Sequence, residues 1–140
     1  MQSYGRSGDI VIDDRMYHYA SEAEKMWLQM IAPGLQTGSV VSLDWQPKSF
    51  PLTYKYDKQD CKDTYRPDAI VVWPDGEEHV IEIKRGFLGE KSASKMRRFC
   101  TQYPDKDLVL VWFGSMPRKG VAKRRIDRLR PLLHHINVIK

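Results

Sequence analysis

Apolar positions recur along this chain with two different periods, and these periods separate helices from strands. From Ala23 to Ile31 they follow the helical spacing i, i+3, i+4, i+7 and i+8, and Pro33-Gly34 ends the run. The same period predicts a second helix that ends at Pro104 and a third over residues 118–130. The inward-facing positions expected in these two helices are Met96, Phe99, Cys100 and Tyr103, then Ala122, Ile126 and Leu129.

The strands are predicted from β-branched and aromatic residues between turn signals. Segments 39–47 and 49–56 each indicate a strand, and 57–63 indicates a polar turn. Segments 66–73 and 77–84, joined by Pro74-Asp75-Gly76, predict a hairpin, and the continuous apolar run 107–113 is typical of a strand covered on both faces. A strand, helix and strand in succession imply a parallel crossover.

The expected fold is therefore α/β, a single domain with a mixed β-sheet flanked by helices in the order α-ββ-ββ-α-β-α. The 140 residues suffice for one hydrophobic core. Residues 1–16 are expected to be a flexible N-terminal arm, and 17–140 the domain itself.

Composition favours a soluble, intracellular, cytoplasmic protein. No apolar run approaches the ~18 residues of a membrane span, and the first residues lack the pattern of a signal peptide. Cys61 and Cys100 have neither the spacing of a zinc site nor the even number and spacing of a disulfide framework. We expect Cys100 to be a packed thiol, and we assign no chemistry to either cysteine.

Positive charge is concentrated near the C-terminus, where residues 117–140 contain eight Lys/Arg and one acidic residue, Asp127. Such a segment favours a polyanionic partner, and DNA or RNA is preferred to a membrane because no helix has a broad aromatic face. The alternative is a solvated basic helix. The candidate phosphate contacts are Lys91, Lys95, Arg98, Arg118, Lys119, Lys123, Arg124, Arg125 and Arg128.

The hairpin turn predicts one specific juxtaposition. If the loop is residues 74–76, facing residues sum to 150, so Asp68 faces Glu82, and Lys84 lies on the same side. Opposed carboxylates on a partly buried face need a positive bridge, and oxygen ligands beside an amine favour Mg²⁺ or Mn²⁺. The alternative is an ordinary strand whose polar residues face solvent. His134 and His135 are expected to be an exposed tail pair, since no carboxylate accompanies them.

These residues resemble the PD-(D/E)XK nuclease superfamily: Pro67-Asp68 matches its PD, and Glu82-Ile83-Lys84 its E-x-K. Ser21-x-x-Glu24 and the strand order look most like the branch of phage endonuclease I resolvases and TnsA-type transposon-end nucleases. The resemblance implies a restriction-endonuclease-like core, with Asp68, Glu82, the Ile83 carbonyl and Glu24 around the metal. Lys84 would then orient or activate the attacking water.

The first predicted helix offers two acidic residues for this site, Glu22 and Glu24. The spacing of Ser21 and Glu24 also fits a capping box, which is a purely structural role. We favour Glu24 as the metal ligand, because its spacing from Ser21 matches the family pattern.

The resemblance implies a metal-dependent DNA endonuclease that hydrolyses phosphodiester bonds, of a phage or mobile element, acting on junctions or DNA ends. We expect a homodimer, because two strands are cut most simply by paired sites, and a protein partner could direct target choice. Two alternatives are kept: a non-catalytic nucleic-acid-binding or assembly module on the same fold, and an interaction protein whose basic tail binds an acidic partner.

Overall fold

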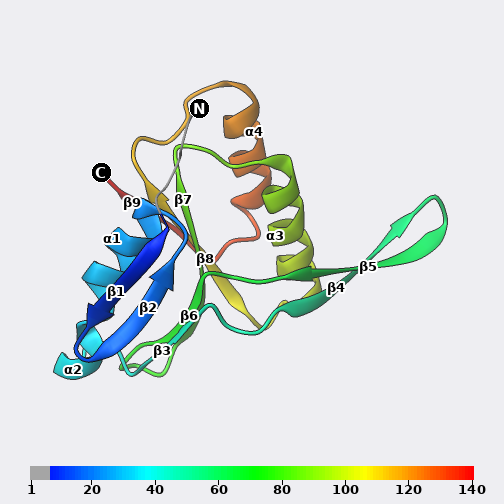
Figure 1. The fold of residues 1–140 in the computed structure, drawn as a ribbon. Coiled ribbons are helices and arrows are strands. Elements are labelled where there is room, and N and C mark those ends of the chain that lie inside the picture. Colours follow the sequence, from blue (N-terminus) through cyan, green and yellow to red (C-terminus); the bar gives the residue numbers. More distant parts are fainter. Residues whose placement is uncertain (1–6) are drawn as a thin grey trace.

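A five-stranded mixed sheet runs through the centre of the molecule (Figure 1). The computed structural model describes residues 7–140. The strand order is β3-β6-β7-β8-β9, with antiparallel pairs from β3 to β7 and parallel pairs from β7 to β9. The bounds are β3 Ser42–Trp45, β6 Ala69–Val72, β7 Glu78–Arg85, β8 Asp107–Phe113 and β9 His135–Ile139.

Separate layers cover the two faces of the sheet, as Figure 1 shows. Helix α1 (Glu22–Ile31), the short α2 (Gly34–Thr37) and a two-stranded hairpin lie on one face, and helices α3 (Glu90–Gln102) and α4 (Gly120–Leu129) lie on the other. Alternate residues of the central strands therefore enter two different cores: Ile81 and Val109 pack with Trp27, while Val80 and Leu108 pack with Phe99. The α/β fold class expected from the sequence is confirmed.

The three long helices lie where the apolar period predicts them, but the buried positions differ in detail. In α1 the buried side chains are Ala23, Trp27 and Leu28, whereas Met26 and Met30 are exposed. The buried stripe is thus rotated toward Leu28. In α4, Ile126 and Leu129 are buried and Ala122 only partly so.

The predicted flexible arm over residues 1–16 is wrong for residues 8–16. Strands β1 (Gly8–Ile12) and β2 (Arg15–Tyr19) form an antiparallel hairpin, with Tyr17 and Tyr19 buried against α1. Asp13 and Asp14 make the two-residue turn with positive φ angles of 50° and 66°. This turn lacks the glycine that usually signals it, although aspartate tolerates the left-handed region. Residues 1–6 lie outside the described part of the chain.

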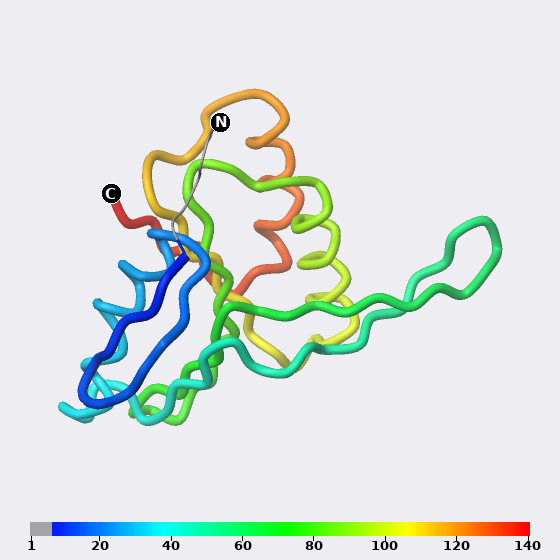
Figure 2. The backbone as a smooth tube through the Cα atoms, in the orientation of Figure 1, coloured from blue at the N-terminus to red at the C-terminus, as the bar shows by residue number. Residues whose placement is uncertain are grey.

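The predicted polar turn over residues 57–63 is wrong for residues 59–63, which belong to a strand. Strands β4 (Phe50–Tyr56) and β5 (Gln59–Tyr65) pair along their whole length and project from the body as a two-stranded ribbon (Figure 2). The turn is again two residues with positive φ, here Asp57 and Lys58. Because β5 has few apolar residues, its sequence resembles a loop, and pairing with β4 makes it a strand.

The C-terminal residues form a strand rather than a tail. β9 pairs in parallel with β8 and is an edge of the sheet, with His135 opposite Val109. Helix α4 supplies the crossover that a parallel pair requires. Among the helices of residues 7–140, none is long and apolar enough to cross a membrane.

Candidate functional site

The predicted hairpin register is confirmed between Ala69 and Val72, which pair with Ile81 and Glu78 respectively. The Trp73 amide donates to the Glu77 carbonyl at 2.9 Å, and Gly76 has a φ of 88°. Proline fixes the first corner of this turn, and glycine accepts the positive φ of the last. The loop therefore sets the alignment of residues 69–72 with residues 78–81. Asp68 departs from this register, because its amide donates to the carbonyl of Ile81 and the prediction places Asp68 opposite Glu82.

Asp68 lies at the point where β6 begins. Its amide donates to the Ile81 carbonyl at 2.9 Å, and its carboxylate oxygen Oδ2 accepts the Ile83 amide at 2.7 Å. The Asp68 carboxylate thus accepts the β7 amide that a backbone carbonyl would accept if the antiparallel pairing continued. The Arg66 guanidinium donates to the carbonyls of Gln46 and Pro47, which fixes the approach to Asp68.

Glu82 is the one charged residue among the buried residues of the described chain, with 8% of its surface exposed. The Tyr65 hydroxyl, at the end of β5, donates to its Oε1 at 2.5 Å, and the Lys84 ammonium lies 3.5 Å from its Oε2. Lys84 also donates to the Ser92 hydroxyl of α3 at 3.2 Å. The two carboxylate oxygens are therefore differently engaged, one by a neutral donor and one by a cation.

Burial changes the acidity of this group of side chains. It raises the pKa of Asp68 well above its ordinary value, and the negative charge of Glu82 adds to the effect. Burial also raises the pKa of Glu82, against the opposing influence of Lys84 and of the Tyr65 hydrogen bond. The Tyr65 pKa is raised well above its ordinary value by burial and then by Glu82, so Tyr65 is a proton donor here. A carboxyl pair in this state favours uptake of a proton or a cation.

Glu24 approaches the same region from α1. A cavity of about 610 Å³ is lined by Glu24, Ile83 and Lys84, together with Ser21, Ala23, Arg85, Gly86 and Phe87. The charge of Glu24 contributes, after burial, to the raised pKa values of Asp68 and Glu82. Glu22 is not among the residues that line this cavity, so of the two acids considered the structure places Glu24 nearer to the site.

Glu24 also makes a capping interaction at the start of α1, although its carboxylate reaches the amide of Ala20 and not that of the N-cap residue Ser21. Its amide donates to the Ser21 hydroxyl at 3.2 Å, and its Oε1 accepts the Ala20 amide at 3.0 Å. The capping role is therefore present in the structure, and any metal-binding role must use the second carboxylate oxygen or a different rotamer.

The basic row of α3 faces the β4–β5 ribbon. Lys95 pairs with Asp63 at 3.4 Å, and the Arg98 guanidinium stacks over the Tyr54 ring at 4.1 Å. Gln102 makes two hydrogen bonds to the backbone of Thr53. Lys95 and Arg98 are thus engaged in anchoring the ribbon, unlike the free phosphate contacts that the sequence predicts. Lys91, at the start of the row, is exposed.

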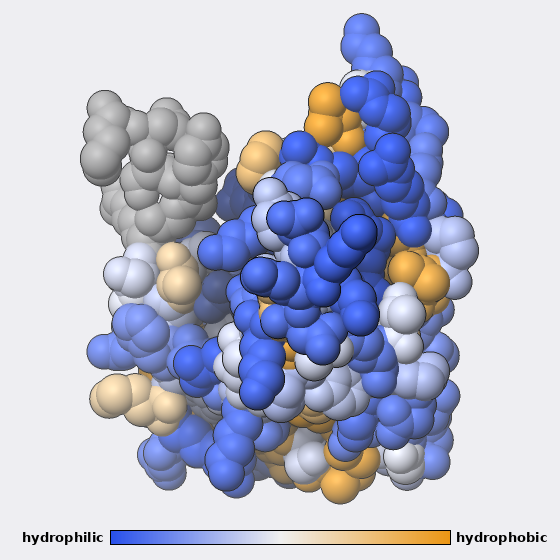
Figure 3. Space-filling model, turned by 90° about the vertical axis from the view of Figure 1, so that its right-hand side faces the viewer, coloured by the Kyte–Doolittle hydropathy of each residue, from blue (hydrophilic) through white to orange (hydrophobic). Residues whose placement is uncertain are grey.

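The candidate basic residues in α4 and just before it fall into two classes. Arg125 donates to Glu90 at 3.1 Å and to the Leu88 carbonyl at 2.9 Å, so it ties α4 to the start of α3. Lys123 pairs with Asp127 at 2.6 Å. Within residues 7–140 the remaining candidates have no ion-pair partner within 4.0 Å and are exposed: Arg118, Lys119, Arg124 and Arg128. The molecule's face in Figure 3 is predominantly hydrophilic.

Tyr65 and Ser92 were not predicted as site residues. Tyr65 lies between the predicted turn over 57–63 and the predicted strand over 66–73, and nothing local connects its hydroxyl with Glu82, 17 residues away. Ser92 looks like an ordinary polar position of α3. Cys100 is partly buried, and burial raises the pKa of its thiol to about 11, which agrees with a packed, unreactive side chain.

A family model described as "Protein of unknown function (DUF1064)" matches residues 1–118. The chain belongs to the DUF1064 family. The DUF1064 match contains Glu24, Asp68, Glu82 and Lys84, and it ends before α4 and β9. No curated protein and no solved structure matches the chain.

Proposed function

We propose that this protein is a Mg²⁺- or Mn²⁺-dependent endodeoxyribonuclease of the PD-(D/E)XK type. One observation carries the proposal: the β6–β7 hairpin brings the Asp68 carboxylate next to Glu82, where its Oδ2 accepts the Ile83 amide at 2.7 Å, and the Lys84 ammonium lies 3.5 Å from Glu82. Two acids and a lysine in this order and spacing match the motif that the sequence resembles.

The residues present suit a hard divalent cation. Two carboxyl groups with raised pKa values lie together, and one cation, the Lys84 ammonium, pairs with Glu82. Oxygen is the donor that Mg²⁺ prefers. Asp68, Glu82 and the Ile83 carbonyl would hold the ion, with Glu24 nearby. The bound ion would polarise a phosphoryl oxygen and acidify a water.

Each side chain then has a separate task. The Ile83 amide and the Tyr65 hydroxyl hold Asp68 and Glu82 in fixed orientations. Lys84, steadied by Ser92, would orient the attacking water and stabilise charge that develops on the phosphate. The water oxygen forms the new bond to phosphorus, and the bond to the leaving sugar oxygen breaks, with a proton restored to that oxygen.

Exposed basic residues in α4 and just before it support DNA as the substrate, and Arg118, Lys119, Arg124 and Arg128 are the proposed phosphate contacts. We further propose that the enzyme acts as a homodimer in the cytoplasm, on junctions or ends of phage or mobile-element DNA. A protein partner would direct target choice.

The deciding experiment is a cleavage assay on supercoiled plasmid, linear duplex, single strand and a four-way junction, with Mg²⁺, Mn²⁺, Ca²⁺ or EDTA. Lys84→Ala should lower the rate at least ~100-fold, because it removes stabilisation of the transition state. Lys106→Ala is the matched control, since Lys106 pairs with Glu78 at the other end of β7. DNA binding without cleavage on any substrate would favour the non-catalytic module, and equal rates in Lys84→Ala and wild type would reject this site.

A further inference from the structure

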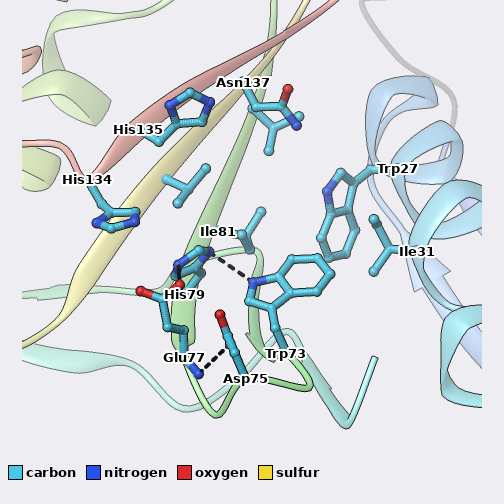
Figure 4. Close-up of a pocket in the computed structure, with 12 residues that line it drawn as sticks. Trp27, Ile31, Trp73, Asp75, Glu77, His79, Ile81, His134, His135 and Asn137 are labelled. Atoms are coloured by element: carbon cyan, nitrogen blue, oxygen red, sulfur yellow. Dashed lines mark hydrogen bonds and ion pairs between the residues drawn. The ribbon is translucent and has the colours of Figure 1, made fainter. Parts of the chain in front are cut away.

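A second group of ionisable side chains lies at the opposite end of β7 from Lys84. Its members are Glu77 in the turn before β7, His79 on β7, Asp107 at the start of β8 and His134 just before β9. One ligand atom of each lies within 4.8 Å of those of the other three. Figure 4 shows Glu77, His79 and His134 converging beside a cavity.

The parallel part of the sheet creates this convergence. His79 pairs directly with Asp107, and the His134 amide donates to the Leu108 carbonyl at 2.9 Å. The three strands therefore begin side by side, since parallel strands place their amino ends at one edge. Glu77 lies in the turn before β7, where its amide donates to the Asp75 carboxylate at 2.9 Å.

His134 and His135 are both exposed, as expected, but the expectation that no carboxylate accompanies them is wrong for His134. Its Nδ1 lies 3.7 Å from Asp107 Oδ1, a carboxylate 27 residues earlier in the chain. His135, the other member of that pair, lines the cavity but is not one of the four clustered residues.

The distances within the cluster are too long for direct hydrogen bonds. His79 Nε2 lies 3.9 Å from Glu77 Oε2, and the His134–Asp107 distance of 3.7 Å is similarly long. His79 Nε2 is inaccessible to solvent and has no hydrogen-bond partner in the structure, which is costly for a buried polar atom. The four side chains lie close together, but at these distances they do not form hydrogen bonds with one another.

We propose that these four side chains bind a transition-metal cation of the Zn²⁺ type. Two imidazoles and two carboxylates form a four-ligand set suited to Zn²⁺, and the two negative charges balance the ion. The ligands come from a turn and three strands, so the ion would join the amino ends of β7, β8 and β9 as a structural site. This inference is independent of the proposed nuclease activity, since it uses none of the same residues.

Trp73 makes the proposal more specific. Its indole Nε1 donates to His79 Nδ1 at 2.9 Å, and an indole nitrogen can only donate. A neutral His79 ring therefore carries its proton on Nε2, the atom that faces the cluster. Metal binding at Nε2 requires this proton to move to Nδ1 and the Trp73 hydrogen bond to break, so Trp73 opposes binding and its fluorescence should report it.

The test is calorimetric titration of the metal-free full-length chain with Zn²⁺, beside Trp fluorescence and melting curves. We expect one Zn²⁺ per chain at this site and a higher Tm with metal. Loss of a neighbour that merely orients a ligand costs 10- to 100-fold in affinity, so His134→Gln and Asp107→Asn should weaken binding by at least ~100-fold. His135→Gln is the matched control and should bind as wild type does.

Two further variants decide the assignment. Trp73→Phe should bind Zn²⁺ more tightly, by up to about tenfold, because one competing hydrogen bond is removed. Glu82→Gln should keep the Zn²⁺ stoichiometry of the wild type. Any of four results would overturn the proposal. The first two are no Zn²⁺ binding in the wild type and wild-type affinity in folded His134→Gln and Asp107→Asn. The others are weaker or unchanged binding in Trp73→Phe and loss of the ion in Glu82→Gln.

Discussion

The Tyr65 hydroxyl donates to Glu82 Oε1 at 2.5 Å and leaves Oε2 on the side of the Lys84 ammonium. This bond links the base of the β4–β5 ribbon to the proposed catalytic strand. It also fixes which oxygen of Glu82 is available to a cation. Tyr65 is therefore a positioning residue for Glu82, and in the proposed reaction it would act only through Glu82.

Replacing Tyr65 with Phe should lower cleavage roughly 10- to 100-fold and raise the Mg²⁺ concentration required, because a freely rotating Glu82 holds the ion less well. The ring keeps its packing against Phe99. A purely structural role would lower the Tm without changing the Mg²⁺ dependence. Tyr103→Phe is the control, since it removes a 2.7 Å hydrogen bond to the Pro51 carbonyl beside the same phenylalanine.

Asp68 should make the metal-free protein less stable as the pH rises. Its pKa is raised in the folded state by burial and by Glu82, from an ordinary value of 3.8, so folding favours the protonated form. That contribution is fully present below the unfolded-state pKa and is lost as the pH rises through the folded-state pKa.

Asp68→Asn removes the charge and keeps an acceptor for the Ile83 amide. In EDTA the variant should melt above wild type at roughly pH 8, and the difference should shrink toward about pH 4, where the wild-type carboxyl is protonated. Mg²⁺ should raise the Tm of the wild type and not that of the variant. If wild type and Asp68→Asn had identical melting profiles across this pH range, burial of the Asp68 charge would have no effect on stability.

Two substitutions of Glu24 distinguish its capping role from its proposed metal-binding role. Glu24→Gln keeps an oxygen that accepts the Ala20 amide, so the helix cap survives while the charge is lost. We expect a nearly unchanged Tm and a raised Mg²⁺ requirement for cleavage. Glu24→Ala should in addition lose ~1 kcal/mol of stability at any metal concentration.

Glu22→Gln is the matched control for this series. If Glu22→Gln alone impairs cleavage, the metal-binding acid lies two residues upstream, and if both glutamines cut normally, α1 contributes no ligand.

Arg124 and Arg125 are adjacent but should respond differently to substitution. Arg124→Ala should weaken binding to all DNA sequences alike and make the slope of log affinity against log salt shallower by roughly 0.9 for a duplex phosphate contact. Its Tm should not change, because Arg124 is exposed.

Arg125→Ala should instead lower the Tm, since its bonds to Glu90 and the Leu88 carbonyl join α4 to α3. Binding and salt dependence are measured by fluorescence anisotropy over a series of salt concentrations. An unchanged slope in Arg124→Ala would assign the exposed side of α4 to a protein partner.

The sequence alone determined the helices, the central hairpin and the proximity of Asp68 to Glu82. These features depend on short-range patterns: a period of 3.6 or 2, and a Pro-Asp-Gly loop whose geometry sets the register on both sides. The register extends as far as the pair Ala69–Ile81 and so brings Asp68 near Glu82, although the Asp68 amide itself donates to the Ile81 carbonyl.

The strands β1, β2, β5 and β9 were missed because their signals are weak or lie in the partner strand. Asp13-Asp14 and Asp57-Lys58 make left-handed turns without glycine, and β5 is polar on most of its length. Only pairing with β4 satisfies its backbone, and only the crossover through α4 places β9 beside β8.

Only the tertiary structure shows which of the basic residues have interaction partners within the protein and which do not. Lys95, Arg98 and Arg125 read as phosphate contacts in the sequence, yet their partners lie on the ribbon and at Glu90. Likewise, Tyr65 meets Glu82, and His134 meets His79 and Asp107, across strands that are distant in the chain. Such contacts depend on how the strands and helices pack together, and no local period or spacing encodes that packing.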